Sequence, residues 1–282
     1  MRITRAAATA AGPHRPASDP LEMADAPSSS ATRRRPGSVS FVVPAYNEER
    51  RLGDSLARLI DFASRQPYTA EIIVVDDGSD DRTASIAREA ARGLPDGVSL
   101  RLLQHERNRG KGAAVRTGAL TATGDDVLYL DADLATPPEE TPKLLAALEA
   151  GADLAAGSRV QPGGIDLRAS QPAWRRIGGR LFALARRRLL LSDVEDTQCG
   201  FKAFRREAAQ AIFPRQRLNR WAFDAELLFL ARKLGFTVQQ VPVAWHHVEG
   251  SSFQIGPISA LREVADLLRI RWLHRHVGRR AI

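Results

Sequence analysis

The feature that most constrains the fold is a series of short, mainly apolar runs separated by helical patterns. The runs are Val39–Val43, Ile72–Val75, Leu100–Leu103 and Val127–Leu130, with a weaker one at Leu154–Ala156. Runs that do not alternate strictly with polar residues indicate strands buried on both faces, as in a parallel sheet covered by helices. The expected fold class is therefore α/β, with a mostly parallel central sheet flanked by helices and right-handed crossovers.

Helical spacing of apolar residues connects these runs. It extends from Leu52 to Ala63 and again through Ile86 and Ala90, and Asn108–Ala113 opens a further expected helix. The chain of 282 residues is 44% hydrophobic, which is enough to bury a substantial core. No window approaches the roughly 20 apolar residues of a membrane-spanning helix, so the sequence predicts no integral membrane protein.

Composition and hydropathy pattern divide the chain into three regions. Residues 1–37 are rich in Ala, Pro, Ser and Arg and predict a disordered tail. Residues 38–248 hold the strand and helix patterns and predict the domain that carries the site. Residues 249–282 predict a basic amphipathic helix with possible contact to a membrane surface.

Charge and cysteine content narrow the function classes. There are 41 Lys and Arg against 33 Asp and Glu, a net charge of +8, which favours an anionic partner such as a phosphate, a nucleic acid or an acidic membrane. No recognition helix, zinc site or RNA-binding aromatic motif accompanies this charge, so no nucleic-acid partner is expected. The single cysteine, Cys199, excludes a disulfide framework and is expected to be buried and inert.

Polar clusters stand where three of the expected strands end. They are Pro44–Glu48, Asp76–Gly78 and Asp131–Asp133. Ligands of such sheets bind beyond the carboxyl ends of the strands, so this edge is the expected active site. Asp131 and Asp133, spaced i and i+2 after a buried strand, are candidate ligands of Mg²⁺ or Mn²⁺; the alternative is an ordinary acidic turn.

Two further segments are candidates for binding a nucleotide. Asp76 and Asp77 could accept hydrogen bonds from a ribose or a base; the alternative is that Asp80 or Asp81 merely caps the next helix. Lys111 lies in a glycine-rich turn at an expected helix start, where a phosphate would be stabilised. The turn is not a Walker loop, and a plain glycine turn is the alternative.

Taken in series, these motifs resemble family 2 glycosyltransferases. The segments that carry the resemblance are Pro44–Glu49, Val75–Ser79, Gly110–Gly112, Asp131–Asp133 and Gly157–Arg159, in that order. The later blocks Asp196–Lys202 and Trp221–Glu226 resemble the dolichyl-phosphate β-glucosyltransferases within that family, which are related to the dolichol-phosphate mannose synthases. The likeness spans roughly residues 38–275.

The resemblance implies a GT-A-type fold, a nucleotide-sugar donor and a metal. The nucleoside pocket would be lined by Pro44, Tyr46, Glu48 and Asp76, with Asp77 and Lys111 as further donor-binding candidates. Asp131 and Asp133 would hold Mg²⁺ or Mn²⁺ and, through it, the donor's diphosphate. Mannose synthases commonly have Gln where Ala135 stands, which favours UDP-glucose over GDP-mannose as the donor.

The expected acceptor is a polyprenyl or dolichyl phosphate. A phosphate monoester is largely dianionic at neutral pH and needs cations rather than a general base. Arg159 and Arg176 are the chosen phosphate-holding residues, and Lys202 belongs to the same basic segment. Asp196 and Asp224, together with Glu226, are candidate acceptor-side or structural carboxylates, one of which would be the base if the acceptor were a hydroxyl.

A C-terminal stripe supports a lipid partner. It consists of Leu261, Val264, Ala265, Leu268 and Trp272, interspersed with arginines. This pattern is typical of a helix in a membrane interface, but a helix packed on the domain with its basic side in water fits equally.

The expected activity is therefore an inverting, metal-dependent hexosyl transfer to a polyprenyl phosphate. The expected location is the cytoplasm, at the inner face of a membrane as a peripheral protein. The alternatives are a GDP-mannose-dependent polyprenyl-phosphate mannosyltransferase, or a soluble family 2 enzyme that acts on a sugar or small-molecule hydroxyl. The sequence gives no oligomeric state.

Overall fold

A computed structural model describes residues 36–163, 166–167, 190–191, 194–246 and 257–278; of residues 257–264 it describes the backbone only. Within these ranges the chain forms one seven-stranded sheet in the order β3-β2-β1-β4-β6-β5-β7. The strands are β1 Ser38–Ala45, β2 Thr69–Asp76, β3 Val98–Gln104, β4 Asp126–Leu130, β5 Leu154–Ser158, β6 Phe201–Arg205 and β7 Val238–Pro242. The helices are α1 Leu52–Ser64, α2 Thr83–Ala90, α3 Lys111–Thr121, α4 Thr141–Glu149, α6 Arg206–Ile212, α7 Phe223–Lys233 and α8 Pro257–Leu273, with short 3₁₀ turns at Pro138–Glu140 and Phe213–Arg215.

The mostly parallel α/β architecture expected from the sequence is confirmed. Strands β1, β2, β3 and β4 pair in parallel, as do β5 and β7. The sequence reasoning did not foresee β6, which runs antiparallel between β4 and β5. Its sequence, FKAFR, carries a lysine that is fully buried, and no hydropathy pattern anticipates a buried charge.

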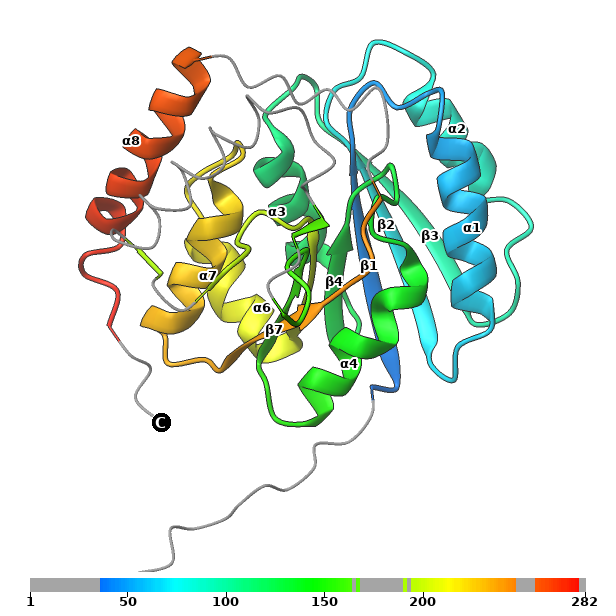
Figure 1. The fold of residues 1–282 in the computed structure, drawn as a ribbon. Helices are drawn as coiled ribbons and strands as arrows, with labels where there is room; N and C mark the ends of the chain where they lie inside the picture. The colour runs from blue at the N-terminus through cyan, green and yellow to red at the C-terminus, as the bar shows by residue number, and fades with distance from the viewer. Residues whose placement is uncertain (1–35, 164–165, 168–189, 192–193, 247–256, 279–282) are drawn as a thin grey trace, which may run out of the picture. The chain divides into compact units, whose positions relative to one another are not determined.

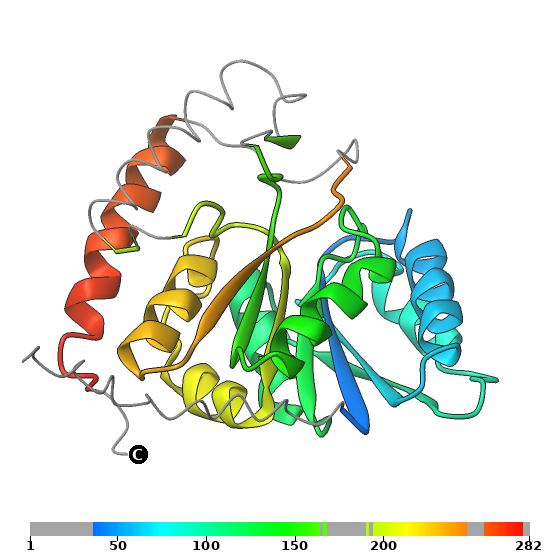
Figure 2. The same cartoon turned by 60° about the horizontal axis from the view of Figure 1, so that its bottom comes forward.

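Helices cover both faces of the sheet (Figure 1). Side chains alternate along β1, so Phe41 packs in the core under α1 and α4 while Val42 packs in the core under α3, α6 and α7. Both Figure 1 and Figure 2 show α8 lying along the outer side of α7. Leu267 and Ile270 of α8 are fully buried against that second core.

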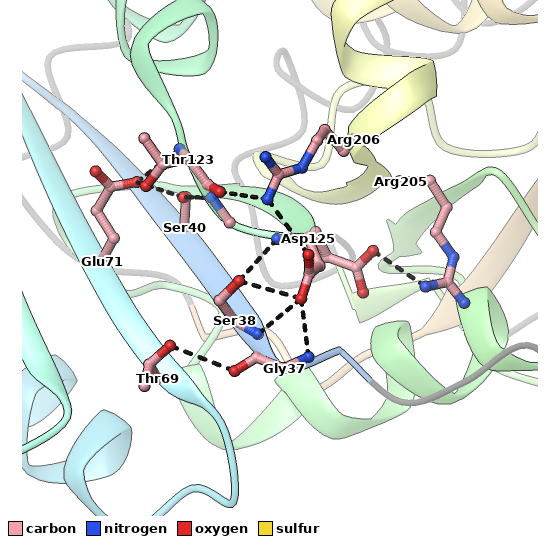
Figure 3. Close-up of polar contacts among 11 residues, drawn as sticks. Gly37, Ser38, Ser40, Thr69, Glu71, Thr123, Asp125, Arg205 and Arg206 are labelled. Atoms are coloured by element: carbon pink, nitrogen blue, oxygen red, sulfur yellow. Dashed lines mark hydrogen bonds and ion pairs between the residues drawn. The ribbon is translucent and has the colours of Figure 1, made fainter.

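The amino-terminal edge of the sheet is closed by a polar network (Figure 3). Asp125 Oδ2 accepts hydrogen bonds from the backbone N–H groups of Gly37 and Ser38, at 2.9 and 3.1 Å, and its Oδ1 pairs with Arg206 at 3.3 Å. Glu71 Oε2 accepts from the Ser40 hydroxyl at 2.5 Å and from the Thr123 N–H at 2.9 Å. We call Glu71, Asp125 and these partners the amino-end network.

Hydrogen bonding at this edge affects the pKa values of Glu71 and Asp125 more than burial does. Burial alone would raise the pKa of Glu71 and of Asp125, but the donors around each carboxylate hold both pKa values below their ordinary range. Asp126, the first residue of β4, differs: burial raises its pKa to about 6, although Arg205 lies 3.4 Å away. Glu71 and Asp125 are therefore well-satisfied anions that seal this edge, whereas Asp126 keeps one buried oxygen, Oδ2, without a hydrogen-bond partner among the described residues.

The length and composition of the helices bear on membrane insertion. Among the residues that the structure describes, no helix is both long enough and apolar enough to cross a bilayer.

Candidate active site

The loops that follow β1, β2 and β4 meet at the opposite, carboxyl-terminal edge of the sheet. The Asp77 N–H donates to the Ala45 carbonyl at 2.8 Å, which joins the ends of β1 and β2. Asp77 in turn holds the Arg109–Gly110 turn, and the Lys111 ammonium that follows pairs with Asp131 Oδ1 beyond β4. The structure therefore brings together Glu48, Lys111, Asp131 and Asp133, which we call the carboxyl-end site.

Asp131 is held between Lys111 and a glycine. A Cβ atom added to Gly200 would lie 2.3 Å from Asp131 Oδ1, so any other residue at position 200 would force this carboxylate to shift. The Lys111 ammonium also lies 5.2 Å from the centre of the Trp221 ring. Burial lowers the pKa of Lys111, but the negative charge of Asp131 outweighs burial and raises it, so the lysine is cationic.

The other carboxylates of the site are poorly neutralised. Asp133 Oδ1 accepts one hydrogen bond, from the Ala135 N–H at 3.1 Å. Burial and then the charge of Asp131 raise the pKa of Asp133. Burial also raises the pKa of Glu48 despite its ion pair with Arg51, and the charges of Asp133 and Asp131 add to the effect. Three carboxylates thus repel one another around two cations, Lys111 and Arg51.

This donor set fits a divalent cation that is shared with a substrate. Hard oxygen ligands suit Mg²⁺ or Mn²⁺, and the mutual repulsion of Asp131 and Asp133 would be relieved by a cation between them. Within the described ranges, no group of three or more His, Cys, Asp or Glu side chains could hold a metal. A cation on Asp131 and Asp133 would therefore complete its shell with water and phosphate oxygens.

The residues expected in the nucleoside pocket have different surroundings. Tyr46 is 38% exposed beside this edge, and Pro44 is buried within β1. Asp76 accepts hydrogen bonds from the Ser79 N–H at 3.0 Å and the Gln104 amide at 3.1 Å. Asp77 accepts from the N–H groups of Arg109 and Gly110 and contacts His105 at 2.6 Å, so it anchors the turn that carries Lys111.

The glycines beside Lys111 serve packing. A Cβ at Gly110 would lie 2.4 Å from the Asn219 carbonyl oxygen, and one at Gly112 would lie 2.8 Å from the Phe223 side chain. Gly110 also has a φ of 101°, which disfavours other residues. The sequence left open whether this stretch lets backbone approach a ligand or is a glycine turn. The structure shows a turn pressed against the segment 216–223.

Two of the acceptor-side candidates form a bidentate ion pair. Arg159 Nε and Nη2 donate to Asp196 Oδ2 and Oδ1 at 2.7 and 2.8 Å, and the Arg159 guanidinium lies 5.7 Å from the Trp245 ring centre. Asp196 is fully buried, so it fixes the plane of the guanidinium. Arg176 lies outside the described residues.

The remaining candidates, Lys202 and Asp224, are buried beneath the site. Lys202 Nζ lies 2.5 Å from Asp224 Oδ1 and donates to the Cys199 carbonyl at 2.6 Å, and the Tyr129 hydroxyl donates to the same carboxylate oxygen. Sequence analysis assigned no role to Tyr129 or Trp221. Tyr129 contacts Asp224, and Trp221 contacts Lys111; the partners lie far apart in the chain, and no local pattern indicates such contacts. Burial raises the pKa of the Cys199 thiol to about 11, in keeping with the expected inert cysteine.

Comparisons with known proteins agree with this architecture. Residues 40–213 match the family described as glycosyl transferase family 2. A dolichyl-phosphate beta-glucosyltransferase of Dictyostelium discoideum is 37% identical over 83% of this chain and 74% of its own length. The Homo sapiens enzyme of the same name is 36% identical over the same shares, and the Saccharomyces cerevisiae enzyme is 32% identical.

Solved structures show the same fold. Glucosyl-3-phosphoglycerate synthase of Mycobacterium tuberculosis, solved with Mn²⁺, UDP and glucosyl-3-phosphoglycerate, superposes with a TM-score of 0.59 at 22% identity. The alignment covers 86% of this chain and 81% of that one. The expected GT-A-type fold is therefore confirmed.

Proposed function

We infer that this chain, which belongs to glycosyl transferase family 2, transfers glucose from UDP-glucose to a polyprenyl phosphate such as dolichyl phosphate, with inversion at the sugar carbon. The observation that carries the proposal is the carboxyl-end site, where Lys111 and a repelling pair of aspartates meet at the sheet edge. Relatives at 32–37% identity carry the name dolichyl-phosphate beta-glucosyltransferase, which supports glucose as the sugar and dolichyl phosphate as the acceptor.

The donor half of the site would bind the nucleotide diphosphate. Asp131 and Asp133 would hold Mg²⁺ or Mn²⁺, which when bound neutralises the negative charge that develops on the departing diphosphate. The Lys111 ammonium would place a second positive charge next to a phosphate oxygen of the donor. Pro44, Tyr46, Glu48 and Asp76 would line the nucleoside pocket, and Asp77 would act by fixing the turn of Lys111.

The acceptor half needs cations and no general base. One oxygen of the lipid phosphate forms a bond to the anomeric carbon as the bond from that carbon to the donor's diphosphate oxygen breaks, and UDP leaves. We propose that Arg159, oriented by Asp196, and Arg176 hold the acceptor phosphate. Lys202 and Asp224, both buried, would support the floor of the site beneath Asp131.

A lipid acceptor fits the exposed face of α8. Leu268 and Trp272 are 54% and 62% exposed, and the Arg275 guanidinium lies 4.7 Å from the Trp272 ring centre. These two residues belong to the apolar stripe expected from the sequence, whereas Leu267 and Ile270 hold the helix to the domain. We propose that this face lies on the anionic surface of a membrane, with the protein peripheral at its cytoplasmic side.

The proposal is tested with radiolabelled UDP-glucose, Mn²⁺ and vesicles that contain an anionic lipid and a polyprenyl phosphate. We expect label in the organic extract, and we expect the chain to sediment with the vesicles. If GDP-mannose proves to be the better donor, the transferred sugar is mannose rather than glucose. Label that stays in the aqueous phase with a sugar or small-molecule hydroxyl would identify the alternative acceptor class.

A further inference from the structure

A continuous chain of contacts leads from the C-terminal helix to the donor half of the site. It begins at His274, which follows α8 and is only 3% exposed. His274 Nε2 lies 2.6 Å from Oε1 of Glu226, a fully buried carboxylate in the first turn of α7. Helix α8, whose outer face is exposed to solvent, is thus fixed at its carboxyl-terminal end by a buried polar contact.

Glu226 holds the segment that precedes α7. Its Oε1 accepts the Arg217 N–H at 2.9 Å and its Oε2 accepts the Leu218 N–H at 2.8 Å. Both carboxylate oxygens are therefore committed, one to the backbone alone and the other shared with His274. Because an unpaired buried N–H is costly, the path of residues 217–218 depends on where this carboxylate sits.

The same segment, residues 216–221, forms two hydrogen bonds with Gly112, which follows Lys111. The Gly112 N–H donates to the Asn219 carbonyl at 2.8 Å, and the Gln216 amide donates to the Gly112 carbonyl, also at 2.8 Å. Gly110 and Gly112 have no space on this side, since a Cβ at either would lie less than 3 Å from the segment. The turn and the segment must move together.

Lys111 itself contacts this segment and Asp131. Its ammonium lies 5.2 Å from the centre of the Trp221 ring and pairs with Asp131. Residues 216–221 thus contact both the backbone of the neighbouring Gly112 and the side chain of Lys111. A displacement of that segment would move the one cation that the described residues place on Asp131.

We propose that His274 and Glu226 are positioning residues of the donor site, whose contact sets the path of residues 217–218 and, through it, the placement of Lys111. The coupling rests on the proposed function only in naming the ligand as a nucleoside diphosphate. The His274–Glu226 contact favours the conformation that binds this diphosphate, and loss of that contact weakens the binding.

The test compares three variants of the full chain. His274→Ala removes the contact to Glu226, and His274→Gln restores a hydrogen-bond donor. Ile270→Ala removes apolar packing from the same helix and leaves the polar path intact. Amide hydrogen exchange of the segment 108–114 is measured without nucleotide, and the affinity for UDP with Mn²⁺ is measured by calorimetry.

We expect faster exchange at 108–114 and about fivefold weaker UDP binding in His274→Ala, with substantial recovery in His274→Gln and no change in Ile270→Ala. Unchanged exchange in His274→Ala overturns the coupling, and so does an equal effect of Ile270→Ala. Failure of the unmodified chain to bind UDP contradicts the proposed donor instead, while the exchange data still decide whether the path exists.

Discussion

The two edges of the central sheet both carry carboxylates, and they treat them in opposite ways. In the amino-end network, backbone N–H groups, hydroxyls and arginines surround Glu71 and Asp125, and the pKa of each carboxyl lies below its ordinary value. At the carboxyl-end site, burial and neighbouring negative charge raise the pKa values of Glu48 and Asp133. Glu71 and Asp125 therefore help to close the fold at one edge, whereas the charges of Glu48 and Asp133 are incompletely compensated at the other.

The difference has a topological cause. Amide groups at the start of the strands, such as those of Gly37 and Ser38, are free to donate to a nearby carboxylate. At the opposite edge the strands end in carbonyls, and the loops beyond them bring the carboxylates of Glu48, Asp131 and Asp133 close to one another. Unsatisfied charge in a fold of this kind marks the place where a cation and a phosphate supply the missing contacts.

The largest expected effect separates the two edges by activity. Asp133→Asn should lower kcat at least about a thousandfold, because it removes a ligand for the cation that stabilises the leaving diphosphate. Asp125→Asn is the matched control at the other edge and should keep kcat within about twofold. Initial rates of glucose transfer with Mn²⁺ measure both. Full activity of Asp133→Asn in the presence of EDTA would refute the metal role.

The second prediction is a smaller effect, on the stability that the amino-end network contributes to the fold. Glu71→Ala leaves the Thr123 N–H and the Ser40 hydroxyl without their acceptor and should cost about 2 kcal/mol of the free energy of unfolding. For a chain of this size, that corresponds to a fall in Tm of roughly 4–8 °C. Activity per folded molecule should not change. A loss of activity at unchanged Tm would mean that the network serves the site.

The smallest expected effect is a pH dependence of that stability. The folded pKa of Glu71 lies below its ordinary value of 4.5, so its charged form stabilises the folded state at pH values above 4.5 and this contribution is lost as the pH falls through the folded pKa. The Tm of the unmodified chain should exceed that of Glu71→Gln by about 2–4 °C at pH 7. The difference should shrink as the pH falls through the folded pKa of Glu71, and a difference that grows toward acid would contradict the assigned sign.

The sequence anticipated the elements whose signals are local. The apolar runs at Val39–Val43 and Ile72–Val75 became β1 and β2, and the helical spacing from Leu52 became α1. The convergence of Asp131 with the turn at Asp76–Asp77 also followed, because parallel strands end at a common edge. The interior of β6 did not follow, since Lys202 is buried only through its pairing with Asp224 on a distant helix.

The sequence by itself determined the fold class and the acidic edge, because hydrophobic periodicity and the chemistry at strand ends are written locally along the chain. Only the tertiary structure decided how each charge is satisfied. Asp77 anchors a backbone turn, Gly200 makes room for Asp131, and Glu226 joins His274 to the segment around Leu218. These contacts join residues far apart in sequence, and the favourable partner of a buried charge depends on which groups the fold brings within a few ångströms of it.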